Sequence, residues 1–249
     1  MELEKYDEEL IPPQEKIFIG EGDFRKIGEN FVKLFVSIGG LKPDDRVLDI
    51  GCGIGRMAAP LATFLSPEGS YDGTDIVKDG IDWCNEKINS KYPNFRFWLD
   101  DIYNSRYNPN GLYKASEYEF PFENNSFDFI FLTSVFTHML YFDTRNYFYE
   151  IRRMLKKGGK CFATFFLLNN ESEELMNKKL SRNYPIHQNF KCYCGREDMP
   201  EAVVAYKEED IFKIAEGCGL ELIKPVYYGN WCGRKSMFTA QDILLFVKK

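Results

Sequence analysis

The stretch VLDIGCGIGR, residues 47–56, constrains the fold more than any other part of the sequence. An apolar run ending in Asp49 and Ile50 changes abruptly into glycine at every second position, at Gly51, Gly53 and Gly55. Glycine loses the most backbone freedom on folding, so this stretch is a poor helix and a poor strand interior. The pattern predicts a buried strand followed by a tight turn at which the backbone closely approaches a ligand.

Strand-like and helix-like segments alternate along most of the chain. Strands are expected at 45–50, 69–76, 95–102, 126–134, 160–168, 220–229 and 240–249, and helices at 22–40, 56–67, 76–92, 144–159 and 208–220. This alternation predicts an α/β fold: a doubly wound, mostly parallel, seven-stranded sheet with helices on both faces. The last two strands have no helix between them, so we expect a hairpin whose final strand runs antiparallel.

A length of 249 residues suits a single domain. Residues 1–20 contain Pro12 and Pro13 and are expected to form an N-terminal arm. Two polar segments, 103–125 and 169–206, interrupt the alternation and show no clean strand. Both follow carboxyl ends of predicted strands, and long loops in compact domains are commonly lids or binding elements. We expect them to form a lid over an acceptor site.

Charge and cysteine content narrow the class of protein. The net charge of −6 disfavours nucleic acid as a partner. No signal peptide or membrane-spanning stretch is apparent, and the 7 scattered cysteines are interpreted as free thiols of a cytoplasmic protein. Cys192 and Cys194 form a C-x-C downstream of His187, but no partner pair completes a four-ligand set, so no metal is expected.

The glycine spacing separates two classes of ligand. Dinucleotide-binding turns have G-x-G-x-x-G, whereas this turn has G-x-G-x-G, with Asp49 two residues before its first glycine. A carboxylate there repels a diphosphate and favours a ligand with a cationic group. A nicotinamide-dependent oxidoreductase is therefore the less favoured alternative.

VLDIGCGIGR closely resembles motif I of the class I S-adenosylmethionine-dependent methyltransferases. The resemblance implies the Rossmann-like methyltransferase fold. It also implies S-adenosyl-L-methionine as the cofactor and S-adenosyl-L-homocysteine as the product. The ammonium and sulfonium of this cofactor suit an acidic turn. The cofactor-binding residues that the resemblance assigns to motif I are Asp49, Gly51, Cys52, Gly53 and Gly55.

Further motifs follow in the family's order. Asp75, followed by Ile76 in GTDI, lies 24 residues after Gly51, close to the ~20 expected for an acid that binds ribose. In LDDI, either Asp100 or Asp101 matches the acid that holds the adenine amino group; we favour Asp101, with Ile102 against the ring. FPFENNSFDFIFLTS resembles the loop and fourth strand, where Thr133 is assigned to the methionine moiety. LKKGGK and the final hairpin also resemble the family pattern.

The acceptor is less clearly indicated. The end of the fourth strand lacks the Asn/Asp-Pro-Pro-Tyr/Phe motif of enzymes that methylate bases or amide nitrogens. His138 lies about one helical turn beyond it and is the candidate general base. We favour O-methylation of a small or medium acceptor, a glycan or metabolite. The main alternative is a non-catalytic, methyltransferase-like cofactor-binding module. The candidate substrate contacts are Trp231, Arg234 and five tyrosines: Tyr103, Tyr107, Tyr113, Tyr118 and Tyr184.

Overall fold

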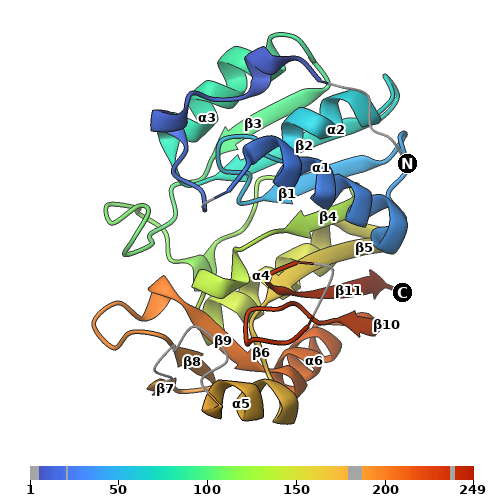
Figure 1. The fold of residues 1–249 in the computed structure, drawn as a ribbon. Coiled ribbons are helices and arrows are strands. Elements are labelled where there is room, and N and C mark those ends of the chain that lie inside the picture. Colours follow the sequence, from blue (N-terminus) through green and yellow to red (C-terminus); the bar gives the residue numbers. More distant parts are fainter. Residues whose placement is uncertain (1–5, 21, 179–186, 236–238) are drawn as a thin grey trace.

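The computed structural model describes residues 6–20, 22–178, 187–235 and 239–249. Its main sheet has the strand order β10-β11-β5-β4-β1-β2-β3 (Figure 1). The strands are β1 (Arg46–Ile50), β2 (Ser70–Asp75), β3 (Phe95–Leu99), β4 (Phe127–Leu132), β5 (Leu155–Phe165), β10 (Leu220–Tyr227) and β11 (Asp242–Lys248). β1 to β5 are parallel, and β11 is antiparallel to both β5 and β10. The predicted seven-stranded, mostly parallel sheet is confirmed.

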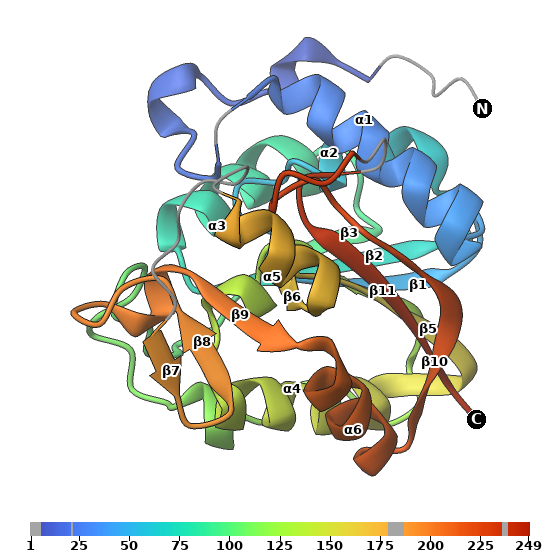
Figure 2. The same ribbon diagram turned by 60° about the horizontal axis from the view of Figure 1, so that its bottom comes forward.

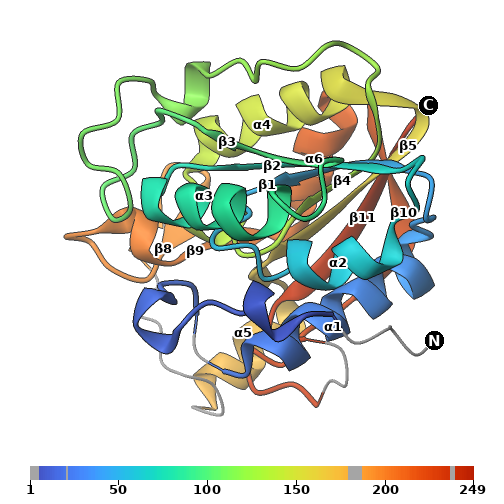
Figure 3. The same ribbon diagram turned by 90° about the horizontal axis from the view of Figure 1, so that it is seen from above.

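Helices cover both faces of this sheet, as seen from above in Figure 3. One face carries α1 (Phe24–Leu34), α2 (Ala58–Phe64) and α3 (Lys78–Cys84), and the other carries α4 (Tyr141–Met154) and α6 (Glu208–Gly217). α1 and α3 continue into π-helical turns at Phe35–Gly39 and Asn85–Asn89. Short 3-10 turns lie at Glu8–Leu10, Gln14–Lys16, Ala115–Glu117, Phe136–His138 and Pro200–Ala202.

Strand β4 shows why the strands are continuously apolar. Phe129 and Phe131 pack into the core beneath α1 and α2, whereas Ile130 and Leu132 pack into the core beneath α4. Successive side chains point to opposite faces, so a strand covered on both sides needs apolar residues at every position.

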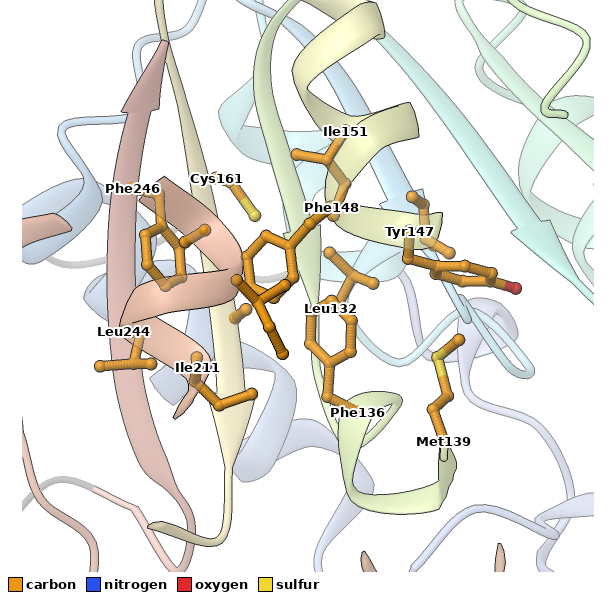
Figure 4. Packing of buried hydrophobic residues seen from close by; sticks show 14 of the residues in the cluster. Leu132, Phe136, Met139, Tyr147, Phe148, Ile151, Cys161, Ile211, Leu244 and Phe246 are labelled. Carbon is orange, nitrogen blue, oxygen red and sulfur yellow. The ribbon is translucent and has the colours of Figure 1, made fainter. Parts of the chain in front are cut away.

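Phenylalanine supplies much of the core beneath α4 (Figure 4). Phe148 of α4 is fully buried, and its ring stacks on Phe136 at a centroid distance of 5.2 Å. It also meets Phe246 of β11 edge-on at 5.3 Å. The rings therefore join α4 and the turn before it to β11, which is distant in sequence. Such pairs contribute ~0.5–1.5 kcal/mol beyond their buried area.

The expectation that residues 169–206 contain no strand is wrong. A second sheet has the order β6-β9-β8-β7, formed by β6 (Leu167–Leu168), β7 (His187–Asn189), β8 (Cys192–Cys194) and β9 (Val204–Lys207). Figure 2 shows it near α5 (Asn170–Asn177). These strands have only two to four residues, too few for a sequence pattern to reveal. Val204 and Tyr206 of β9 are buried in the core beneath α4.

Two further boundaries differ from expectation. The helix predicted at 144–159 begins at Tyr141 and ends at Met154, because Leu155 already pairs with Phe127 and starts β5. The N-terminal arm packs against the domain, with Tyr6 and Leu10 buried in the core. In the part of the chain that the structure describes, no helix is long and apolar enough to cross a membrane.

Candidate functional site

A cavity of about 360 Å³ lies at the carboxyl ends of four neighbouring strands. Its floor includes Gly51 after β1, Ile76 after β2, Asp100 after β3 and Thr133 after β4. The N-terminal arm contributes Phe18, Ile19 and Gly20, and the loop after β3 contributes Tyr103, Asn104, Arg106 and Tyr107. The chain runs outward from β1 through β2 to β3 and then crosses back to β4 on the other side of β1. This reversal is the switch point at which doubly wound sheets bind ligands.

The glycine turn has the backbone conformation that its sequence predicts. Gly51 and Gly53 both line the cavity, with φ of +83° and +58°, in the left-handed region that favours glycine. A Cβ on Gly53 would lie 2.8 Å from Cγ2 of Ile19, so the arm lies directly on the turn. Gly55 differs from expectation: it does not line the cavity, and its Cβ would meet Ile88 Cδ1 at 2.7 Å, so it allows the turn to pack against a helix.

Asp49 lies at the base of the turn and is 1 % exposed. The Tyr71 hydroxyl donates a hydrogen bond of 2.7 Å to its Oδ2, while Oδ1 is buried with no hydrogen-bond partner among the described residues. Burial raises the pKa of Asp49 well above its ordinary value. A cationic ligand would supply both the missing donor and the opposite charge, in agreement with the sequence argument.

Asp75 links the second strand to the glycine turn. Its Oδ2 accepts from the Gly53 N–H at 2.7 Å and its Oδ1 from the Val77 N–H at 2.9 Å. Burial raises the pKa of Asp75, and these backbone donors oppose the rise. Each carboxylate oxygen can accept a second hydrogen bond. Asp75 therefore lines the cavity already oriented and still able to accept from hydroxyl groups.

The cysteine of the turn, Cys52, also lines the cavity and is buried. Burial raises the pKa of its thiol well above the ordinary value. A raised pKa favours the neutral thiol, the less nucleophilic form.

The two candidate adenine acids have different environments. Asp100 lines the cavity, is 3 % exposed and accepts from the Tyr118 hydroxyl at 2.8 Å. Asp101, the residue that we favoured, is exposed, does not line the cavity and accepts from the Leu112 N–H at 3.2 Å. β3 ends at Leu99, and the hydrogen bond from the Asp100 N–H to the Asp75 carbonyl, at 2.9 Å, holds Asp100 against β2. Ile102, the next residue after Asp101, lines the cavity.

His138 lines the cavity after β4. Its Nδ1 lies 3.0 Å from the Glu201 carbonyl oxygen. A carbonyl oxygen only accepts, so Nδ1 carries the hydrogen and, in the neutral ring, Nε2 is the acceptor. Burial lowers the pKa of His138, which favours this neutral form. The ring of Tyr107 meets the imidazole edge-on at 5.8 Å.

The two insertions meet at the residue that orients His138. Glu201 Oε2 accepts a hydrogen bond of 2.8 Å from the Ser105 N–H and a second, short one from the Ser105 hydroxyl. The backbone carbonyl of Glu201, in segment 169–206, therefore contacts His138. The side chain of Glu201 binds Ser105, in segment 103–125.

Other expected substrate contacts lie elsewhere. Trp231 donates to Asp242 at 2.7 Å, and Arg234 pairs with Asp242 and Glu171; neither lines the cavity. The buried Asp242 carboxylate also accepts from the Leu167 and Gly229 N–H groups, so these side chains help to order the C-terminal loop. Of the five tyrosines, Tyr103 and Tyr107 line the cavity, Tyr118 binds Asp100, Tyr113 is exposed, and Tyr184 lies outside the described residues.

The C-x-C segment is not arranged as a metal site. His187 pairs with Glu197, Nδ1 to Oε1, at 2.8 Å. Within the described ranges, no group of three or more His, Cys, Asp or Glu is placed to hold an ion.

Several cavity residues were not predicted from sequence. The arm residues Phe18 and Ile19 and the helix residue Tyr147 come together only through tertiary packing. Arg56 is different, because it belongs to the quoted motif and follows the last glycine directly. Its position within the motif could have indicated that Arg56 lines the cavity.

Comparisons with known proteins give one family. A family model described as a methyltransferase domain matches residues 48–163. An uncharacterized methyltransferase of Schizosaccharomyces pombe is 26 % identical over 119 residues, 48 % of this chain and 39 % of that protein. The chain spans less than two thirds of the length of the curated relatives that it matches.

Solved structures show the same fold. A SAM-dependent methyltransferase of Methanosarcina mazei aligns with a TM-score of 0.58 at 22 % identity, covering 86 % of this chain and 96 % of that one. A protein of Pyrococcus horikoshii aligns with a TM-score of 0.62 at 18 % identity, covering 94 % and 95 %.

In this family the cofactor is S-adenosylmethionine and the reaction is transfer of its methyl group, so the nicotinamide alternative is not supported. The ordered motifs, the sheet with its antiparallel strand and the family-model match agree. Residues 48–163 match the model of the methyltransferase-domain family, and the fold is that of solved SAM-dependent methyltransferases.

Proposed function

We propose that the protein transfers a methyl group from S-adenosylmethionine to a hydroxyl group of a small or medium acceptor, a metabolite or a glycan. The observation that carries the proposal is His138, held in the cavity by a hydrogen bond that leaves Nε2 as a proton acceptor. A hydroxyl nucleophile must lose its proton during the reaction, and a neutral imidazole is a suitable base near pH 7.

The cofactor end of the cavity is assigned residue by residue. Asp49 offers its free oxygen to the ammonium, Asp75 accepts from the ribose hydroxyls, and Asp100 accepts from the adenine amino group. Ile76 and Ile102 pack against the adenine ring. When bound, the cofactor supplies an electrophilic methyl group on sulfur.

The remaining chemistry belongs to the acceptor end. His138 Nε2 would take the proton of the acceptor hydroxyl, and the cofactor, when bound, would supply the methyl group that the oxygen receives. Tyr107 meets the His138 ring edge-on at 5.8 Å, and Tyr103 and Tyr147 add further aromatic surface to the cavity. Such walls orient an acceptor and exclude water, which is most of what an in-line displacement requires.

The two insertions are proposed to form the acceptor lid, because they meet at Glu201, which also holds His138. We further propose a single domain acting in the cytoplasm, without nucleic acid as a partner. All seven cysteines are free, as expected in a reducing compartment, and the net charge is −6.

The test compares the protein's two histidines. Turnover would be followed as S-adenosylhomocysteine release against a panel of hydroxyl and amine acceptors. His138→Gln keeps a donor for the Glu201 carbonyl but cannot take a proton, so turnover should fall by about 100- to 10,000-fold. His187→Gln, at an exposed ion pair outside the cavity, should retain activity. The binding of S-adenosylhomocysteine should be unchanged in both variants.

Two results would contradict the proposal. One is full turnover of the His138 variant, which would remove the base. The other is a panel in which amines alone are methylated, which would replace O-methylation with N-methylation.

A further inference from the structure

Arg106 places a positive charge at the His138 end of the cavity. Both residues line the cavity, and both contact the ring of Tyr107. The Arg106 guanidinium lies over this ring, with Cζ 5.0 Å from the ring centroid, and the imidazole meets the ring edge-on at 5.8 Å. A cation and the proposed base therefore share one aromatic wall.

The turn that carries Arg106 is fixed by its own hydrogen bonds. Asn104 and Asn108 exchange two backbone hydrogen bonds, of 3.1 and 3.0 Å, which close the turn. The Asn104 side chain accepts from the Arg106 N–H at 3.0 Å. The intervening Ser105 is bonded to the same residue that orients His138. The fold therefore fixes the backbone of Arg106 relative to the imidazole.

The charge of Arg106 opposes protonation of His138. Burial lowers the pKa of His138, and Arg106 acts in the same direction through its charge. Proton transfer from an acceptor would turn the imidazole into a second cation near the guanidinium, which like-charge repulsion disfavours. An anion bound to Arg106 would offset this repulsion and raise the pKa of His138. The base would therefore be most effective when such an anion occupies the cavity.

We propose that Arg106 binds a carboxylate or phosphate group of the acceptor, so that the substrate is an anionic molecule whose hydroxyl group meets His138. The proposal rests on the proposed function and narrows its acceptor class. A guanidinium binds either anion through two parallel hydrogen bonds. Arg106 is exposed at the cavity, where an entering acceptor can reach it.

The test uses the imidazoles as reporters, which makes it independent of turnover. The chain has two histidines, His138 and His187, and proton NMR can follow both as the pH is varied. The full chain would be loaded with S-adenosylhomocysteine, so that the carboxylate of the cofactor product is already bound. It would then be titrated with acetate, with methyl phosphate and with neutral acetamide at constant ionic strength, because salt screens exposed charges.

Acetate or methyl phosphate should shift the His138 signals saturably and raise the pKa of His138. The anion that acts at the lower concentration identifies the acceptor group as a carboxylate or a phosphate. Acetamide should have no effect. His187, which pairs with Glu197 outside the cavity, should not respond to any of the three probes.

Variants assign the response to one side chain. Arg106→Met should abolish it, and Arg106→Lys should retain part of it, because lysine restores the charge without the planar fork. Both variants should bind S-adenosylhomocysteine within about twofold of wild type, which also shows that they are folded. Arg145→Met is the matched control and should respond as wild type, because Arg145 is an exposed arginine over the ring of Tyr149, at 5.5 Å, outside this cavity.

Turnover provides a second readout. Within the panel of hydroxyl acceptors, anionic members should be converted with higher kcat/KM than their neutral analogues. Arg106→Met should raise KM for the anionic members about 10- to 100-fold, the range expected for hydrogen bonds between charged groups. Neutral members should change little.

Three results would overturn the proposal. One is an absent response of His138 to both anions, and another is an equal response in Arg106→Met. The third is a neutral substrate that wild type and Arg106→Met convert equally well. A failure of the proposed O-methylation would look different: the anions would still act on His138 through Arg106, while amines alone were methylated.

Discussion

The adjacent acids Asp100 and Asp101 allow a sharp test of the adenine contact. Replacing each by asparagine preserves shape and removes one charge. Asp100 is buried at the cavity, where burial raises its pKa to about 6, whereas Asp101 is exposed outside it. If Asp100 accepts from the adenine amino group, only Asp100→Asn should weaken the binding of S-adenosylhomocysteine.

The expected size of the effect follows from the charge of the hydrogen bond. Hydrogen bonds to charged groups contribute ~1.5–3 kcal/mol and neutral ones ~0.5–1.5 kcal/mol, so neutralising Asp100 should cost about 1–1.5 kcal/mol, or about five- to tenfold in affinity. Protonation of Asp100 also removes its charge and should weaken the binding of S-adenosylhomocysteine in the same way. The donor of the ligand favours the ionised form, so affinity rises with pH through the pKa of the free protein. With a pKa of about 6, only about a tenth of Asp100 is ionised at pH 5, so most of its contribution at pH 8, about five- to tenfold, should be lost at pH 5.

The assay is calorimetric titration of wild type and both variants between pH 5 and pH 8. Asp49 and Asp75 also line the cavity with raised pKa values, so the quantity of interest is the difference between wild type and Asp100→Asn at each pH. That difference should be about five- to tenfold at pH 8 and nearly vanish at pH 5. A difference independent of pH, or an equal effect of Asp101→Asn, would refute the reasoning.

Three further predictions concern the turn, the C-terminal loop and the core. Gly53→Ala should weaken the binding of S-adenosylhomocysteine, measured by calorimetry, because its φ of +58° disfavours a side chain and the new Cβ would lie 2.8 Å from Ile19; unchanged affinity would contradict the close packing of the arm. Trp231→Phe should lower the free energy of unfolding in urea by about 1–3 kcal/mol through loss of the bond to Asp242, with turnover unaffected; a loss of turnover would return Trp231 to the acceptor site. Phe148→Ala should destabilise the protein by about 3–5 kcal/mol in the same assay, and a cost below that of Trp231→Phe would contradict the packing in Figure 4.

Sequence alone predicted the architecture and most of the residues that we propose for the cofactor half of the site. The alternation of segments and the absence of a helix before the last strand predicted the sheet and its antiparallel strand, because both follow from local periodicity and short connections. Asp49, Gly51, Gly53 and Asp75 were recognisable because they lie within or just after strands, in a fixed spacing that the backbone itself imposes.

Tertiary structure decided what local patterns do not contain. Which of Asp100 and Asp101 faces the cavity depends on the residue at which β3 ends. In the second sheet, β6 pairs with β9, about 40 residues further along the chain. The orientation of His138 depends on Glu201, 63 residues away, and the placement of Arg56 beneath Ile19 on packing of the arm. Contacts of this kind form only when segments distant in sequence come together in the folded chain. Local sequence patterns therefore do not reveal the surroundings of the side chains that we propose for the acceptor end.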